Sequence, residues 1–196
     1  MEKKREVAHV LAQAYGPLSK EAEAQLASML VEQRTLKGRF LLEKGQVCQH
    51  IYYVGQGMLR QVYDKGGRQV TEHIAYEGGM IMCIESLFRR EPSAIAIEAL
   101  EPSVTYGIPY EDFCLLTRRS YEYCAFLIRI FQESLIISQQ KADTLRFETA
   151  KERYLRTLKD HPGIIRRAPL NMVASYLQMT PETLSRVRTK ISEGDK

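Results

Sequence analysis

Glycine is distributed unevenly along this chain of 196 residues, and its distribution restricts the fold more than any other feature does. Most of the 12 glycines lie between residues 38 and 107, among short runs of alternating apolar and polar residues, whereas residues 108–162 contain none. Short alternating runs separated by turn residues favour a sandwich or barrel of antiparallel strands. A glycine inside a helix costs about 1 kcal/mol relative to alanine, so the glycine-free segment favours a long helix.

One hairpin can be placed from its turn alone. Residues 64–67 read Asp-Lys-Gly-Gly and separate two alternating runs at residues 59–63 and 69–74. Paired glycines suit a tight turn whose central residues need positive φ angles. The spacing therefore predicts two antiparallel strands joined at Gly66 and Gly67.

The remaining segments have helical spacing. Residues 1–34 carry two apolar stripes, broken at Gly16-Pro17, and predict short helices that cover the β region. Helical spacing continues past residue 147, with breaks at His161-Pro162-Gly163 and before Pro169. From the length and these changes of pattern we expect a β-rich sensor domain at 1–115, a long helix at 116–146 and a small helical domain at 147–196.

Charge and composition narrow the class of protein. The net charge of +4 is carried by residues 147–196, because the rest of the chain is balanced, and a basic module suggests a polyanionic partner. No apolar run is long enough to span a bilayer and the N-terminus lacks a signal-peptide core, so we expect a cytoplasmic protein that does not associate with membranes. The four cysteines are scattered, which predicts reduced thiols and no metal site.

Residues 169–191 contain two helical segments separated by a short turn. Thr180 is a good N-cap, and Pro181 lies in the first turn of a helix, where a proline loses no hydrogen bond. One helix is predicted to end near Leu177, the chain to turn through residues 178–179, and the second helix to begin at Thr180. This pattern predicts a helix-turn-helix.

The second of these helices has an outward polar face. Leu184, Val187 and Ile191 recur at spacings of three and four and should face inward. The opposite face carries a carboxylate, which can accept a hydrogen bond from cytosine N4, and an arginine, which can donate two to guanine. We predict that Glu182, Ser185 and Arg186 read bases. We predict contacts to the DNA backbone from Arg166, Arg167, Thr180, Thr183, Arg188, Thr189 and Lys190.

The long glycine-free helix has a repeated apolar pattern of its own. Apolar and small residues recur at spacings of three and four, as they do along a seam between two helices, although a serine and a lysine interrupt it. A helix packed on its own β domain would show a similar pattern. We predict a dimer interface made by Leu127, Ile130, Phe131, Ser134, Ile137, Ser138, Lys141 and Leu145.

Several runs resemble the Crp/Fnr superfamily, the group of the cyclic-AMP receptor protein and the Fnr regulators. Residues 174–177 (Ala-Ser-Tyr-Leu) and 180–186 (Thr-Pro-Glu-Thr-Leu-Ser-Arg) are similar to its helix-turn-helix. Residues 43–45 (Glu-Lys-Gly), 52–54 (Tyr-Tyr-Val) and 57–60 (Gly-Met-Leu-Arg) follow the order of its cyclic-nucleotide-binding β-roll. The resemblance implies an α+β fold with an N-terminal double-stranded β-helix, a long dimerisation helix and a C-terminal winged helix-turn-helix.

The resemblance also implies roles for particular residues. Family members carry Glu and Arg at the positions of Glu182 and Arg186, where these side chains contact bases. Ser185 resembles the Fnr branch, which implies an inverted repeat of TTGA-like half-sites in double-stranded DNA, read by a homodimer, with RNA polymerase as a further partner.

The effector pocket departs from the family pattern. Cys83 and Ile84 replace the Gly-Glu pair that grips the ribose, and Pro92 stands where an arginine would grip the cyclic phosphate. A phosphate anion needs a charge-assisted partner, so we expect neither cyclic AMP nor cyclic GMP to bind in the usual mode. Another small effector would meet a pocket formed by Met82, Cys83, Ile84, Glu85, Arg89, Arg90, Ser93, Ala94, Ser138 and Gln139.

These features predict a sequence-specific DNA-binding transcription regulator and no enzyme, because no nucleophile–base pair or phosphate-binding loop is present. The alternative is an effector-binding β-roll that acts on a protein partner, with the C-terminal helices as a docking surface. A third reading is a constitutive regulator whose pocket is vestigial. No cofactor is expected from the sequence.

Overall fold

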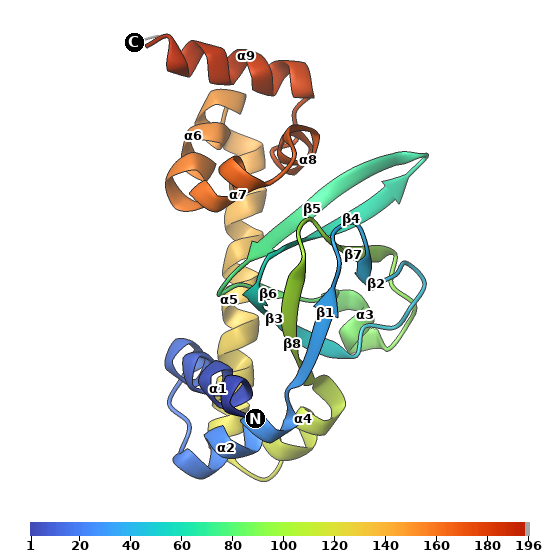
Figure 1. The fold of residues 1–196 in the computed structure, drawn as a ribbon, viewed down its shortest axis with the longest axis vertical. Helices are drawn as coiled ribbons and strands as arrows, with labels where there is room; N and C mark the ends of the chain where they lie inside the picture. The colour runs from blue at the N-terminus through green and yellow to red at the C-terminus, as the bar shows by residue number, and fades with distance from the viewer. Residues whose placement is uncertain (195–196) are drawn as a thin grey trace.

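The computed structural model describes residues 1–194 and shows two antiparallel sheets, one long helix and two groups of shorter helices (Figure 1). Helices α1 (Glu2–Tyr15) and α2 (Lys20–Met29) precede the sheets. The strands are β1 (Val31–Thr35), β2 (Phe40–Leu42), β3 (His50–Gln56), β4 (Met58–Lys65), β5 (Arg68–Tyr76), β6 (Met80–Ile81), β7 (Ile95–Ala99) and β8 (Ser103–Pro109). Helix α3 (Ile84–Arg89) lies between β6 and β7.

The strands form two four-stranded sheets, in the orders β1-β8-β3-β6 and β2-β7-β4-β5. Buried side chains of both sheets, such as Ile51 and Ile108 from one and Leu59 and Ile97 from the other, belong to a single apolar core. This arrangement confirms the predicted antiparallel β domain. The predicted hairpin is also confirmed, because β4 and β5 meet at Gly66 and Gly67, whose φ angles are 61° and 79°.

Helices make up the rest of the described chain. They are α4 (Tyr110–Thr117), α5 (Tyr121–Phe147), α6 (Ala150–Asp160), α7 (Pro162–Arg167), α8 (Leu170–Tyr176) and α9 (Pro181–Ser192). In Figure 1, α5 runs along most of the length of the molecule and connects the α1, α2 and α4 end with the α6–α9 end. The long glycine-free helix expected at 116–146 is therefore α5, and residues 110–117 form a separate helix before it.

A capping box begins the C-terminal group of helices. The Thr149 hydroxyl accepts a hydrogen bond from the backbone N–H of Glu152, whose carboxylate accepts one from the N–H of Thr149. Such reciprocal bonds satisfy N–H groups that a helix start leaves unpaired. They fix the point at which the chain leaves α5 and turns into α6.

The wing expected beside the helix-turn-helix is not seen. In the family pattern a wing is a β-hairpin, but within residues 1–194 no strand follows β8. After α9 the chain only turns through Glu193 and Gly194. The helix-turn-helix is present as α8 and α9, and the wing stays a prediction that residues 1–194 do not show.

Gly57, between β3 and β4, provides a test of the packing in the β domain. Its φ is 91°, and a Cβ added there would lie 2.4 Å from the Ser103 hydroxyl and 2.7 Å from the carbonyl oxygen of Pro102. Backbone strain and overpacking each cost about 1–3 kcal/mol, so Gly57→Ala should lower the free energy of unfolding by about 3 kcal/mol in urea denaturation. Gly45→Ala is the control, because Gly45 has a similar φ of 90° with no atom in reach, and equal losses for the two variants would contradict this packing.

Candidate nucleic-acid interface

Helices α8 and α9 have the geometry of a helix-turn-helix. Helix α8 ends at Tyr176, and the chain turns through Gln178, whose φ is 51°, before the Thr180 hydroxyl caps α9 by accepting a hydrogen bond from the N–H of Thr183 at 3.2 Å. The backbone N–H of Met179 also bonds back to the carbonyl of Ala174 at 3.0 Å. These contacts confirm the predicted turn and fix the direction of α9 relative to α8.

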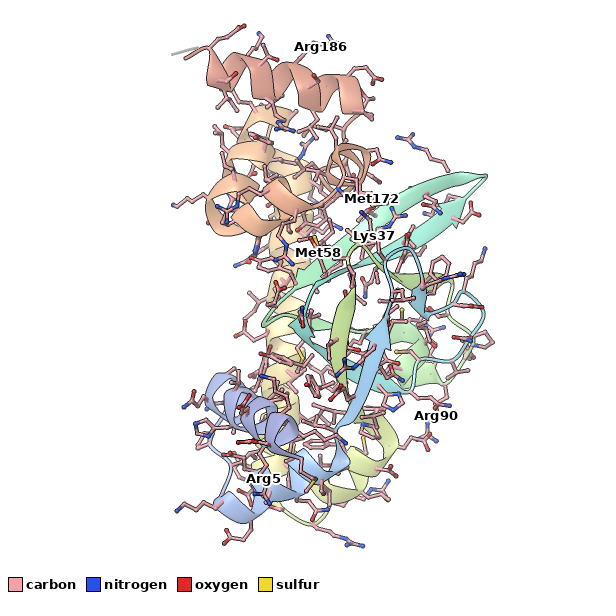
Figure 2. The ribbon with its side chains drawn as sticks, in the orientation of Figure 1. Arg5, Lys37, Met58, Arg90, Met172 and Arg186 are labelled. Carbon is pink, nitrogen blue, oxygen red and sulfur yellow. The ribbon has the colours of Figure 1, made fainter. Side chains whose placement is uncertain are left out.

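The predicted base-reading side chains all lie on the exposed side of α9. Glu182, Ser185 and Arg186 are exposed, whereas Leu184 between them is 1% exposed and packs against α8. Figure 2 shows Arg186 at the outer edge of the molecule, away from α6–α8. A carboxylate, a hydroxyl and a guanidinium are thus presented together on one accessible helix face.

Glu182 is held in its charged form. Hydrogen bonds from its own backbone N–H and from the Thr180 hydroxyl lower the pKa of the Glu182 carboxyl, with a smaller contribution from the charge of Arg186. A carboxylate at the start of a helix is also favoured by the helix dipole. At neutral pH the side chain is therefore a hydrogen-bond acceptor, as contact with a base amino group requires.

Most of the side chains predicted to contact the DNA backbone are accessible. Arg166, Thr180, Arg188, Thr189 and Lys190 are exposed, and Thr183 is half-buried with its hydroxyl bonded to that of Thr180. A groove of about 440 Å³ runs beside α9 and is lined in part by Leu170, Ser185, Arg188 and Thr189. The first residue of α8 and the exposed face of α9 therefore border the same surface.

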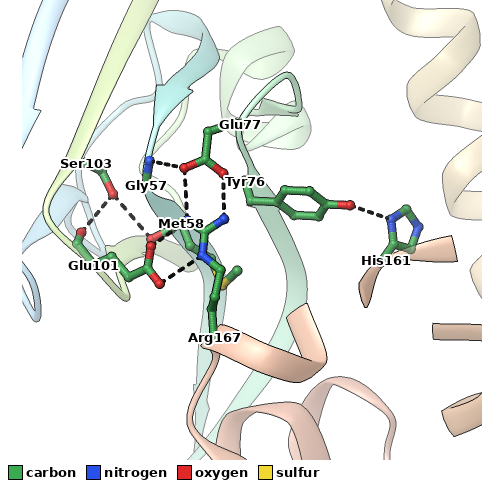
Figure 3. A network of polar contacts seen from close by, with 8 residues as sticks. All are labelled: Gly57, Met58, Tyr76, Glu77, Glu101, Ser103, His161 and Arg167. Carbon is green, nitrogen blue, oxygen red and sulfur yellow. Dashed lines mark hydrogen bonds and ion pairs between the residues drawn. The ribbon is translucent and has the colours of Figure 1, made fainter. Parts of the chain in front are cut away.

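Arg167 is the exception among the predicted backbone contacts. Its guanidinium pairs with the carboxylates of Glu77 and Glu101 in the β domain at 2.7 and 2.6 Å, so it is not free for a phosphate in this structure (Figure 3). The Arg167 hydrogen bonds lower the pKa of Glu77 to about 2, and the two carboxylates raise the pKa of Arg167. Both groups stay charged at neutral pH. No local pattern in the sequence points to either glutamate as a partner, because Glu77 and Glu101 lie 90 and 66 positions before Arg167.

The proposed dimer interface needs a correction on α5. Leu127 and Ile130 are 9% and 1% exposed and lie in the core of the β domain, so their inclusion in an interface was wrong. Ile137 follows Ile130 by seven residues and shares its face, and Lys141 on the same face bonds to Glu72 of β5. This face points toward the chain's own sheets. The spacing of apolar residues alone could not show which side of α5 faces the sheets, because α5 carries apolar residues on two sides.

The other side of α5 remains uncovered. Ile128 is 49% and Leu135 71% exposed, and a separation of seven residues places them on one face of the helix. Of the other predicted interface residues, Ser138 is exposed, whereas Phe131, Ser134 and Leu145 are half-buried, and Phe131 packs against Phe88 and Tyr110 of the chain's own β domain. The unpartnered apolar stripe is therefore rotated relative to the predicted one and centres on Ile128 and Leu135.

The predicted effector-pocket residues divide into a buried group and an exposed group. Met82, Cys83 and Ser93 are buried; the Cys83 thiol donates to the carbonyl of Ile95 at 3.7 Å, and the Ser93 hydroxyl donates to the same carbonyl at 2.7 Å. Ile84, Glu85, Arg89, Arg90, Ala94, Ser138 and Gln139 are exposed.

The charged residues of the predicted pocket form ion pairs on the protein surface. Arg89 pairs with Glu85 along α3 at 3.4 Å, and Arg90 pairs with Glu111 of α4 at 3.1 Å. Gln139 donates to the Asp143 carboxylate on α5. In this conformation neither arginine is directed with Ser93 toward one anion. Among residues 1–194, no three His, Cys, Asp or Glu side chains gather as metal ligands.

Two comparisons identify similar proteins. The sequence profile of the cyclic nucleotide-binding domain matches residues 32–120. FixK2 from Bradyrhizobium japonicum superposes with a TM-score of 0.73 at 16% identity, covering 84% of this chain and 85% of its own. The catabolite activator protein of Thermus thermophilus gives 0.55 at 23% identity, with 94% and 87% covered. A transcriptional regulator assigned to the Crp/Fnr family from Eubacterium rectale gives 0.67 at 18% identity, with 92% and 88% covered.

A comparison with curated proteins gives no significant match. None of the helices in residues 1–194 is both long and apolar enough to cross a membrane. The matched domain covers β1 to α4, and the superposed structures extend over the long helix and the C-terminal helices, so domain order and fold agree with the resemblance seen in the sequence. Residues 32–120 thus match the cyclic nucleotide-binding domain, and the chain has the fold seen in Crp/Fnr-type transcription regulators.

Proposed function

We propose that this protein is a cytoplasmic, homodimeric transcription regulator that reads an inverted repeat of TTGA-like half-sites in double-stranded DNA. RNA polymerase is its expected protein partner at a promoter. The proposed activity is binding, and it involves no catalytic step. The fold shared with FixK2 and with the catabolite activator protein supports this function.

One observation carries the proposal: Glu182, Ser185 and Arg186 project from the exposed face of α9 while Leu184 anchors the helix to α8. An α-helix fits the major groove, where a carboxylate and an arginine distinguish C·G from the other base pairs. Two such helices in a two-fold symmetric dimer read half-sites about one helical turn apart. An inverted repeat is therefore the geometric consequence of the symmetry.

Selection from a pool of random duplexes tests the proposal. The purified full-length protein is expected to enrich an inverted repeat whose half-site centres lie about 34 Å apart, or a multiple of that distance. Selection should be repeated at two salt concentrations, since nonspecific binding to phosphates falls steeply with salt and specific binding persists longer. Recovery of no common sequence, or of a single half-site, would contradict a dimeric regulator and favour a role in binding a protein partner.

We further propose that cyclic AMP and cyclic GMP are not the effectors. Cys83 and Ile84 offer no group for a ribose hydroxyl, because the buried thiol of Cys83 donates to the carbonyl of Ile95 and Ile84 is apolar. The Ser93 hydroxyl is bonded within its own turn, and Arg90 pairs with Glu111. Desolvating a phosphate in such a pocket would cost free energy without a charged partner to offset it.

A further inference from the structure

Arg167, the last residue of α7, is the centre of the strongest polar contact between the β domain and the C-terminal helices. Its guanidinium donates to Glu77 at 2.7 and 2.9 Å and to Glu101 at 2.6 and 3.1 Å. Figure 3 shows the arginine reaching between the two carboxylates. Paired N–H···O contacts of this kind are the strongest hydrogen bonds available to an arginine side chain.

Contacts within the β domain order the two turns that carry these glutamates. The backbone N–H of Gly57 donates to Glu77 at 2.7 Å, and the Ser103 hydroxyl donates to the carbonyl of Glu101 at 2.8 Å. These contacts order the turns that carry the two glutamates. The Glu77 carboxylate is thus positioned by the β domain itself, and the turn that carries Glu101 is ordered beside it, so that the two carboxylates receive one guanidinium.

Other contacts around Arg167 hold the same helices against the sheet. The Tyr76 hydroxyl lies 3.3 Å from Nδ1 of His161, and the Ser175 hydroxyl accepts from the N–H of Thr71 at 2.9 Å. Apolar side chains of the β domain continue the contact beneath them: Met58, Ile74 and Leu100 share a buried cluster with Ile164 and Leu177, among others. The C-terminal helices are thus docked on the β domain in the chain described here.

Arg167 is also close in sequence to the surface proposed to bind DNA. It precedes the first residue of α8, Leu170, by three positions, and Leu170 lines the same groove as Ser185 and Arg188 of α9. Arginines next to the recognition helix usually hold phosphates, and a DNA phosphate presents the same charged oxygens as a carboxylate. Glu77 and Glu101 use four of the five N–H groups of the guanidinium, on both of its edges, so no edge is left for a bidentate contact with a phosphate.

We infer that Glu77 and Glu101 form an autoinhibitory latch, in which the β domain occupies Arg167 in place of a DNA phosphate. This inference rests on the proposed DNA-binding function. Opening the latch gives each protomer one additional phosphate contact and releases α7 and α8 from the edge of the β domain. The sensor domain thereby controls DNA affinity through the position of two carboxylates.

A double variant, Glu77→Gln with Glu101→Gln, tests the latch in the full-length protein. Glutamine keeps the size of the side chain and can still accept the N–H of Gly57, but it has no charge to hold Arg167. Affinity for the selected duplex, measured by fluorescence anisotropy, should increase about tenfold, and the slope of log K against log salt should steepen by about one per protomer. In an Arg167→Ala background the same double variant should leave the affinity for the duplex unchanged, because the two glutamates act on that affinity only through the Arg167 side chain.

The matched control removes two negative charges from other Arg–Glu pairs of the β domain. Glu32 pairs with Arg34 at 2.9 Å and Glu111 with Arg90, so Glu32→Gln with Glu111→Gln makes the same change in net charge. This control should leave the affinity within about twofold of the unaltered protein. An equal increase in control and test variants would overturn the latch, because it would show a general effect of net charge.

A measurement without DNA separates failure of the latch from failure of the proposed function. Hydrogen–deuterium exchange of residues 162–176 should be faster in the Glu77→Gln, Glu101→Gln variant than in the control, as α7 and α8 open more often. Unchanged exchange together with unchanged affinity overturns the latch and leaves DNA binding intact. Faster exchange in a protein that selects no duplex sequence overturns the proposed function instead.

Discussion

An Arg186→Ala variant is expected to lose between ~30-fold and ~10⁴-fold in affinity for its inverted repeat while its fold and its dimer stay intact. A bidentate arginine–guanine contact contributes about 1–3 kcal/mol of discrimination, and a dimer makes two of them. Because the Arg186 side chain is exposed on α9, its truncation removes no contact of the core. Fluorescence anisotropy with the selected duplex and with a scrambled duplex measures the loss.

Arg188→Ala is the matched control for that measurement. Arg188 lies two residues further along α9 and lines the groove beside it, where we propose contact with a phosphate. Loss of a phosphate contact weakens binding to every duplex by a similar factor and reduces the salt slope by about one. The ratio of affinities for selected and scrambled DNA should therefore fall in Arg186→Ala only. An unchanged ratio in Arg186→Ala would remove this arginine from the reading face.

A second large effect is expected at the uncovered stripe of α5. Leu135→Glu places a charge at the centre of the proposed dimer seam, where each copy would desolvate it without a partner. The dimer should weaken by at least about a thousandfold, and sedimentation velocity should show a monomer at micromolar concentration. Affinity for the inverted repeat should fall with it, since a monomer reaches one half-site at a time.

Ile137→Glu separates the two stripes of α5. Ile137 is 48% exposed but lies two residues from Leu135, about 200° around the helix, on the face that Ile130 directs into the β domain. This variant should remain dimeric. If Ile137→Glu were monomeric and Leu135→Glu remained dimeric, the interface predicted from spacing would be correct, and an interface centred on Ile128 and Leu135 would be contradicted.

The elements that sequence reasoning located are those whose chemistry is local. Gly66 and Gly67 adopt the positive φ angles that a tight hairpin needs, and Thr180 caps α9 with its own hydroxyl. In each case the cause and the effect lie within three or four residues, so the pattern is readable without the fold. The inward and outward faces of α9 could also be predicted, because the helical period alone decides which residues share a face.

Contacts between distant segments could not be predicted in this way. Arg167 was assigned to a phosphate because it is basic and near the helix-turn-helix, and nothing near Glu77 or Glu101 signals an arginine as partner. The two apolar stripes of α5 show a similar limit. A periodic apolar pattern indicates that one side of a helix is buried. Whether the chain's own sheets or a second copy of the chain covers that side depends on the tertiary fold.

The apolar cluster around Met58, Ile74 and Leu100 makes the recognition helix a dependent part of the fold. These three side chains come from the β domain, yet they complete the core in which Val173 and Leu184 are buried. A fragment cut within the connection after α5 would leave that core open on one side and lose cooperativity. A change in packing at the strand ends near Met58 and Ile74 should therefore alter the position of α9 through this shared core, in addition to the polar contacts around Arg167.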